Sequence, residues 1–231
     1  ENEINRTNRD MKNLIYVTTH DLQIPLISIE GFANLLIRSC KKEKMSTESV
    51  EYLNRIIANT KSMTSLFKNF FDISKINSVK NPFEMIDVSD LIKKVISDKK
   101  YLTDKYGAKV KIDNPSSIKN IYGDKENIKL LYHHLIANAV IYGGKNIVIG
   151  YDERKGYYVK DDGSGIAESD LEKIFLPGER LNEGDILSSG MGLAFCRKTI
   201  EIHNGRIYAE SEGKNKGTTV YFTLSNELIR D

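Results

Sequence analysis

The chain lacks several features that would mark whole classes of protein. It has no tryptophan, only four prolines and only two cysteines among 231 residues. The cysteines, Cys40 and Cys196, lie far apart in unlike contexts, so we expect free thiols in a reducing compartment rather than a disulfide or a metal site. No apolar run is long enough to span a bilayer and no signal peptide is visible, so we expect a cytoplasmic stretch that is not embedded in a membrane.

The charge of the chain is also nearly balanced, with 34 basic against 32 acidic side chains and a net charge of +2. This balance does not argue for nucleic acid or a membrane surface as the main partner. A hydrophobic content of 40% with 29% charged residues is typical of a globular protein of one or two domains. The sequence begins without methionine and already in a polar helical register, so we expect a fragment whose full-length protein can be anchored to a membrane upstream.

Two helical patterns occupy the first third of the chain. Over residues 11–36 a heptad seam with spacings of four and three is formed by Met11, Ile15, Leu22, Ile29, Phe32 and Leu36, with Thr18 and Pro25 at the two remaining positions. A similar pattern covers 50–71, and Ser46 or Thr47 can cap its start. A short polar turn between them predicts an antiparallel hairpin. Its seam is wide, which favours pairing with a second copy as a four-helix bundle. The alternative is a plain coiled-coil spacer.

A histidine and an aspartate interrupt the first helical pattern in the stretch TTHDLQIPLI. Helical geometry places His20 roughly 160° from the seam positions, and therefore on the face toward water. A neutral imidazole there is a nitrogen nucleophile near pH 7, and Asp21 can accept its proton or fix its tautomer. Pro25 predicts a bend one turn later. The alternative is an exposed His-Asp pair beside a tolerated kink.

After about residue 77 the pattern changes to a mixture of helices and strands. Helices are expected near 88–104, 124–142, 168–174 and 191–203, and strands near 109–113, 145–151, 157–161, 205–210 and 217–224. The order is not a regular alternation of strand and helix. We therefore expect an α/β sandwich with a mixed sheet.

Two glycine-bearing loops in this region are suited to a nucleotide. In YYVKDDGSGI a strand leads to Asp161, which can accept a hydrogen bond from a purine amino group, while Gly163 and Gly165 permit close approach or positive φ. Further on, Gly190 and Gly192 precede an amphipathic helix whose free amides can face phosphates. The polar stretch between the loops is suited to a mobile lid.

Other phosphate and metal motifs are absent from the sequence. There is no G-x-x-x-x-G-K-[ST] loop, neither glycine pair completes G-x-G-x-x-G, and DDGSG lacks the alternating oxygen ligands of a calcium loop. Upstream, His134 and Asn138 are four residues apart on one helical face. The amide oxygen of Asn138 could reach a magnesium ion held on nucleotide phosphates.

Taken in order, these stretches resemble the motifs of two-component sensor histidine kinases. THDLQIPL resembles the phosphoacceptor box, HHLIANAVIYG the asparagine box, DDGSGI the first glycine box, IFLPGER the phenylalanine box and SGMGL the second glycine box; HNGRIYAES and GTTVYFTL resemble the end of the catalytic domain. The resemblance implies an α+β chain. A long antiparallel helical hairpin, a four-helix bundle in the dimer, would precede an α/β sandwich of the Bergerat ATPase type.

The resemblance also implies roles for individual residues. His20 matches the phosphorylated histidine and Asp21 the adjacent acid, Asn138 the magnesium-binding asparagine, Asp161 the adenine-reading aspartate and Arg180 the arginine that meets the γ-phosphate. The implied ATP-binding set is His134, Asn138, Tyr142, Asp161, Gly163, Gly165, Ile166, Arg180, Ser189, Gly190, Met191, Gly192, Leu193 and Thr218, with Asn138 also the metal ligand.

Several positions depart from the family pattern. Four residues past the phosphoacceptor, where the family usually has Thr or Asn to orient water for dephosphorylation of the partner, this chain has Ile24. Ile141 replaces the usual basic residue of the asparagine box, which weakens the grip on phosphate unless Lys145 or Arg180 compensates. The remaining departures are His134 for an asparagine, Gly178 for a phenylalanine and Ser188 for a glycine.

The resulting prediction is an ATP- and magnesium-dependent protein-histidine kinase core with domains at 1–80 and 81–231. It would form a homodimer through the hairpin, autophosphorylate His20 and pass the phosphoryl group to the aspartate of a response-regulator receiver domain. One alternative is a nucleotide-binding pseudokinase signalling module with weak or no turnover. A second alternative is an ATP-driven conformational clamp of the chaperone or mismatch-repair kind.

Overall fold

The computed structural model describes residues 26–37, 46–76, 81–179 and 190–230. The chain divides into two compact units. The hairpin unit comprises residues 1–79 with 180–191, and the α/β unit comprises 80–179 with 192–231. The predicted domain boundary between residues 80 and 81 stays a prediction.

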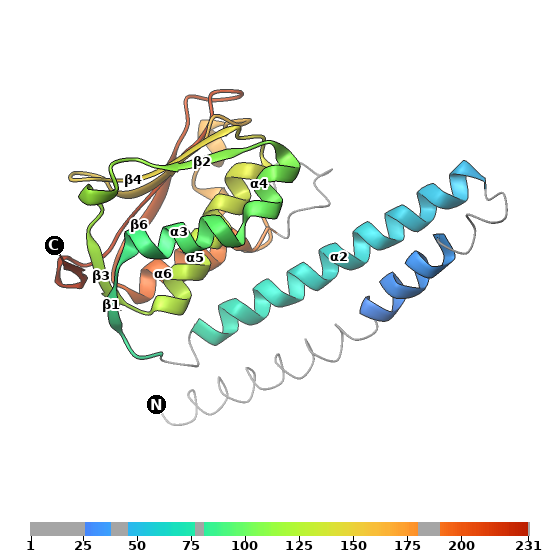
Figure 1. The fold of residues 1–231 in the computed structure, drawn as a ribbon, viewed down its shortest axis with the longest axis horizontal. Helices are drawn as coiled ribbons and strands as arrows, with labels where there is room; N and C mark the ends of the chain where they lie inside the picture. The colour runs from blue at the N-terminus through green and yellow to red at the C-terminus, as the bar shows by residue number, and fades with distance from the viewer. Residues whose placement is uncertain (1–25, 38–45, 77–80, 180–189, 231) are drawn as a thin grey trace. The chain divides into compact units, whose positions relative to one another are not determined.

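The described part of the hairpin unit consists of a helical segment, 26–37, and helix α2, Thr47–Ile76. Figure 1 shows the two running side by side in opposite directions, and an ion pair of 3.3 Å between Lys61 Nζ and Glu30 Oε1 joins them. The start of α2 is capped by Ser46, whose Oγ accepts a hydrogen bond of 3.2 Å from the amide of Ser49. The helical hairpin is thus present as expected, with Ser46 as the cap.

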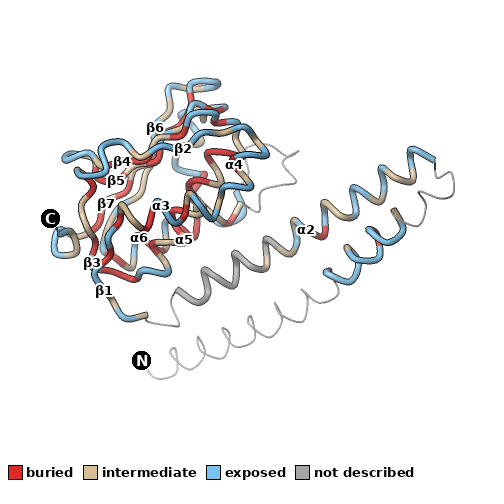
Figure 2. The backbone as a smooth tube through the Cα atoms, in the orientation of Figure 1, coloured by how far each residue is buried: buried red, intermediate tan, exposed pale blue. Residues whose placement is uncertain are grey.

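The apolar face of the hairpin is only partly covered within one chain. Leu26 and Ala33 are buried at 7% and 4% exposure, whereas the predicted seam residues Ile29, Phe32 and Leu36 are 46%, 65% and 50% exposed. Figure 2 shows the same segment mostly in the colour of exposed residues. A single chain therefore leaves much of the predicted seam in contact with solvent.

The α/β unit contains two sheets and four helices among its described residues. The five-stranded sheet has the order β2-β4-β5-β7-β6, and the three-stranded sheet has the order β1-β3-β8. Strands β2 and β4 are parallel and all other pairs are antiparallel, which confirms the expected mixed sheet. The helices are α3 Val88–Asp98, α4 Lys100–Tyr106, α5 Lys125–Ile141 and α6 Gly192–Ile202; the strands are β1 Glu84–Ile86, β2 Lys109–Ile112, β3 Asn120–Gly123, β4 Asn146–Asp152, β5 Gly156–Lys160, β6 Arg206–Glu210, β7 Thr219–Thr223 and β8 Ile229–Arg230.

Three sequence-based assignments in this unit were wrong or incomplete. The single helix expected over 88–104 is two helices that meet at Lys99, and the helix expected over 168–174 is replaced by two short 3-10 turns, Glu168–Asp170 and Lys173–Phe175. The three strands of the smaller sheet were not predicted. Each has at most four residues, too few for an alternating pattern to be visible.

The larger of two hydrophobic clusters in the described α/β unit forms its main core. It joins α3 and α5 to the inner face of the five-stranded sheet through fully buried side chains that include Leu131, Ile136, Ile149 and Phe222. Tyr157 stacks on Phe222 at a ring-centroid distance of 5.1 Å. The core thereby fixes α5 and strand β5, the two elements whose C-terminal ends lead into the candidate site.

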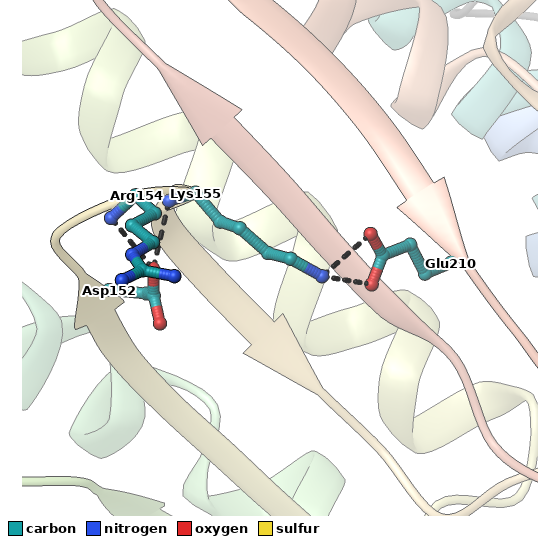
Figure 3. Close-up of polar contacts among 4 residues, drawn as sticks. All are labelled: Asp152, Arg154, Lys155 and Glu210. Carbon is teal, nitrogen blue, oxygen red and sulfur yellow. Dashed lines mark hydrogen bonds and ion pairs between the residues drawn. The ribbon is translucent and has the colours of Figure 1, made fainter.

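The outer face of the same sheet carries aromatic and charged side chains. Lys155, in the turn between β4 and β5, extends across β7 to pair with Glu210 on β6 at 2.7 Å (Figure 3), and its ammonium lies 4.8 Å from the centre of the Tyr221 ring. Nearby, the Tyr158 hydroxyl donates a hydrogen bond of 2.9 Å to Asp113, and a Cβ at Gly150 would lie only 2.5 Å from that hydroxyl oxygen. The Tyr158 side chain therefore lies across Gly150, where a larger residue would not fit.

Candidate nucleotide site

The first element of the site is the loop after β5, which begins with Asp161. Its Oδ1 accepts hydrogen bonds from the amides of Gly163 at 2.8 Å and Thr218 at 3.3 Å, and its own amide donates to the Thr218 carbonyl at 2.9 Å. Within the described residues Oδ2 has no hydrogen-bond partner. Burial raises the pKa of Asp161 above its ordinary value, against the opposing effect of the two amides. The carboxylate is thus held rigidly with one oxygen left for a ligand.

Glycine is required in this loop for steric reasons. A Cβ at Gly163 would lie 2.5 Å from the carbonyl oxygen of Tyr142, and Gly165 has a φ of 65° with a Cβ position in collision with the Gly213 carbonyl. The loop is also tied to helix α5, because Ser164 donates its amide to the Tyr142 carbonyl at 2.9 Å. These contacts bring the predicted residues Gly163 and Tyr142 together and place Gly165 against Gly213.

The C-terminal part of α5 contributes Asn138 and His134, both half-buried. The Asn138 carbonyl accepts the amide of Tyr142 at the end of the helix, at 2.9 Å. The His134 ring lies against Phe195 of α6 at a centroid distance of 5.1 Å, and a Cβ on Gly192 would approach its Nδ1 to 3.0 Å. His134 therefore packs under the first turn of α6, where asparagine is usual in the family that the sequence resembles.

Of the remaining predicted ATP-binding residues, Gly190, Met191, Ile166 and Leu193 lie within the described residues. Gly190 has a φ of 66°, and Met191 is buried at 9% exposure just before α6. Ile166 and Leu193 both pack against the small apolar cluster formed by Ile174, Phe175 and Ala209. His20, Asp21, Ile24, Arg180, Ser188 and Ser189, and the predicted bend at Pro25, lie outside the described residues.

Two residues important for the loop were missed from the sequence. The Ser211 hydroxyl donates to the Gly217 carbonyl at 2.7 Å and accepts the Ile166 amide at 3.0 Å. Gly217 has a φ of 72°, and a Cβ there would collide with the Asp161 carbonyl oxygen, so no side chain fits. The only signal was the concentration of Ser and Gly in SEGKNKGT, which predicts a turn but not its tertiary partner.

The structure also locates the basic residue considered as a replacement at position 141. Lys145 directs its ammonium to the Tyr106 carbonyl at the end of α4, at 2.6 Å. Its amide and that of Asn146 are both bound by Asp162 Oδ1, at 2.6 and 2.9 Å. Lys145 thus joins α4 to β4, and this contact gives no support for a role in gripping phosphate.

A divalent cation at this site would have few protein ligands. No group of three or more His, Cys, Asp or Glu in the described ranges could hold a metal ion. The half-buried amide of Asn138 is one oxygen donor on the α5 face that leads to the glycine loop. A magnesium ion keeps several waters and is commonly completed by phosphate oxygens, so one amide fits an ion that arrives with its nucleotide.

Comparison with known families follows the same two-part division. Residues 123–228 match the family of histidine kinase-, DNA gyrase B- and HSP90-like ATPases, and residues 10–79 match the His Kinase A (phospho-acceptor) domain. The α/β unit is therefore an ATP-binding domain of that ATPase class. With the phospho-acceptor domain before it, the chain belongs to the two-component sensor histidine kinases and represents their kinase core.

Curated relatives extend over nearly all of this chain. The phytochrome-like protein Cph1 of Synechocystis is 27% identical over 228 residues, which cover 96% of this chain and 30% of Cph1. The methanogenesis regulatory histidine kinase FilI of Methanothrix harundinacea is 28% identical over 233 residues, covering 96% of this chain and 25% of FilI. The chain thus spans less than a third of the length of these relatives.

Solved structures agree with the fold. The catalytic domain of histidine kinase ThkA is 26% identical with a TM-score of 0.52, covering 62% of this chain and 95% of that domain. Full-length ShkA in complex with AMPPNP matches over 91% of this chain and 45% of its own, with a TM-score of 0.64 and 19% identity, which supports the fold alone. Within the described residues, no helix combines the length and apolar character needed to cross a membrane.

Proposed function

We propose that this chain transfers the γ-phosphoryl group of ATP to its own His20. The observation that carries the proposal is the immobilised Asp161 carboxylate, bound by Gly163 and Thr218 with Oδ2 left open, in a chain that also carries a phospho-acceptor domain. An ionised carboxylate in that setting accepts the amino group of adenine and orients the nucleotide. The pseudokinase alternative is less favoured, because the matched relatives include proteins named as histidine kinases.

The chemistry of the proposed step is an in-line displacement. A neutral imidazole nitrogen of His20 forms a bond to the γ-phosphorus while the bond from phosphorus to the bridging oxygen of ADP breaks, and Asp21 accepts the proton released from the ring. Magnesium, held through Asn138 and the phosphates, would supply stabilisation of the developing negative charge. Arg180 is proposed to meet the γ-phosphate from the segment before α6.

The partners follow from the same assignment. We propose a homodimer through the hairpin, in which the exposed Ile29, Phe32 and Leu36 are covered by the second copy. The phosphoryl group would then pass to an aspartate of a response-regulator receiver domain. Ile24 lacks a polar group to orient water, so we expect little removal of phosphate from that partner. A cytoplasmic location for this core also belongs to the proposal.

The decisive experiment is incubation of the chain with γ-labelled ATP and magnesium. Acid-labile label should appear on wild type and be lost in His20→Gln, while Asn138→Ala should lose label through weaker nucleotide binding. Label that persists in His20→Gln would show that the phosphoacceptor is misassigned. Nucleotide binding with no label on wild type would instead favour the pseudokinase.

A further inference from the structure

The segment that enters the α/β unit is bound to a buried carboxylate. Asn81 donates its side-chain amide to both oxygens of Asp124, at 3.1 and 3.0 Å. Asp124 is only 2% exposed and also accepts the amide and the side-chain amide of Asn127, at 3.1 and 2.6 Å. Every hydrogen bond to this buried carboxylate comes from an uncharged donor among the described residues, so removal of one donor leaves charge less compensated.

Two residues further on, the same segment is held by a ring stack. Phe83 lies parallel to the His203 imidazole, with ring centroids 4.9 Å apart and planes inclined by 11°. His203 is fully buried, its Nδ1 lies 2.7 Å from the Thr199 carbonyl, and its Nε2 accepts the amide of Asp124 at 3.0 Å. These bonds assign the proton to Nδ1 of a neutral ring. Asp124 and His203 are thus hydrogen-bonded to each other, and this pair, the Asp124–His203 node, contacts both Asn81 and Phe83.

The node lies at particular ends of two helices. Asp124 caps the N-terminus of α5, and His203 follows the C-terminus of α6. The nucleotide-site residues Asn138 and Gly192 belong to the opposite ends of those helices, about 20 Å away along α5. The segment before β1 thus contacts α5 and α6 at the ends that lie far from the candidate nucleotide-site residues.

We propose that Asn81 and Phe83 are positioning residues for phosphotransfer. They attach the segment that follows the phospho-acceptor domain to the Asp124–His203 node. When this segment is displaced, α5 and α6 therefore move with it as rigid bodies. This inference rests on the proposed kinase function. The attachment sets how often the ATP-loaded domain reaches His20, and it does not alter the affinity of that domain for nucleotide.

This role predicts a split between two kinetic constants. The pocket is built from the far ends of α5 and α6, so loss of the attachment should leave the KM for ATP within about twofold of wild type. Misplacement of reacting groups by about 1 Å can reduce a rate by about a hundredfold, so we expect kcat for autophosphorylation to fall about tenfold or more in Asn81→Ala. Phe83→Leu should behave alike.

The chain offers a matched control for this experiment. Asn127→Ala removes a side-chain amide bond to the same Asp124 carboxylate, but from within α5 rather than from the entering segment. Phe83→Tyr keeps a ring on His203 and should restore kcat. Measurements on the full chain would comprise labelled-phosphate uptake against ATP concentration, AMP-PNP affinity, and hydrogen exchange of residues 81–86.

The outcomes separate the attachment from the kinase function. The positioning role is supported if Asn81→Ala and Phe83→Leu lower kcat and leave KM unaltered, while Asn127→Ala and Phe83→Tyr keep a near-normal kcat. Hydrogen exchange of residues 81–86 should be faster only in Asn81→Ala and Phe83→Leu. Equal kcat losses in Asn81→Ala and Asn127→Ala, or unaltered exchange of 81–86, would overturn the positioning role. Absence of label on wild-type His20 would instead refute the kinase function, while the exchange data would still judge the attachment.

Discussion

The α/β unit and the hairpin unit differ in where their apolar side chains lie. In the α/β unit, residues such as Ile136, Ile149 and Phe222 are completely buried in a core that joins helices and sheet. In the described part of the hairpin, by contrast, Phe32 and Ile27 are 65% and 61% exposed. The α/β unit thus has a hydrophobic core of its own, whereas the described part of the hairpin leaves apolar side chains exposed, as is typical of an interaction surface.

The largest expected effect is loss of the core in the self-sufficient unit. Phe222→Ala deletes a fully buried ring that stacks on Tyr157, and should lower the free energy of unfolding of the α/β unit by about 3–5 kcal/mol. Phe32→Ala, which also deletes a phenylalanine ring, serves as the control. Denaturant titration followed by tyrosine fluorescence measures both; similar losses in the two variants would contradict the contrast between the units.

A charge on the exposed hairpin face should act on assembly rather than on the α/β fold. Phe32→Glu places a carboxylate where we propose that a second copy packs, and should weaken dimerisation about a hundredfold or more. Sedimentation equilibrium gives the dissociation constant. Glu51→Gln, on an exposed i,i+4 pair of α2, is the control and should leave it unaltered. An unaffected dimer in Phe32→Glu would place the interface elsewhere.

The buried His203 should make the stability of the α/β unit depend on pH. Burial lowers the pKa of His203 below its ordinary value, chiefly by desolvation, against the opposing influence of Thr199 and Asp124. The unfolded state therefore binds the proton more readily. Stability is complete above the unfolded pKa of about 6.5 and decreases as pH falls toward the lowered folded pKa, by at most about 1.4 kcal/mol per pH unit.

Thermal unfolding between pH 7.5 and 5 measures this dependence. His203→Gln should be less stable at pH 7.5 but show a shallower slope below pH 6.5, because Gln has no titrating proton. A slope unaltered by the substitution would assign the pH dependence to other groups.

The smallest expected effect is a gain in stability within the core. The Tyr132 hydroxyl is buried without a hydrogen-bond partner in the described structure, and burial raises the pKa of Tyr132 well above its ordinary value. Tyr132→Phe should therefore raise the free energy of unfolding by about 1 kcal/mol. Denaturant titration tests this, with Tyr157→Phe as control, because the Tyr157 hydroxyl donates to the Lys119 carbonyl and its loss should destabilise.

Local chemistry explains what could be predicted from the sequence. Helix α5 was predictable because Asp124 caps it and an apolar pattern follows, and Asp161 with Gly163 was predictable because a strand runs into a tight turn. The strands β1, β3 and β8 escaped prediction because their pairing is non-local and each is very short. Ser211, the bond from Lys145 to Tyr106 and the Asn81–Asp124 contact escaped for the same reason: their partners are distant in sequence.

The Tyr158 side chain that lies across Gly150 has a consequence for how this sequence can vary over evolution. A side chain at position 150 would collide with the Tyr158 ring. A smaller residue at position 158 would no longer cover the Gly150 backbone and would remove the hydroxyl that donates to Asp113. Neither position can change freely alone. Among relatives, the residues at these two positions should therefore covary, glycine with a large aromatic and a bulkier residue with a small one.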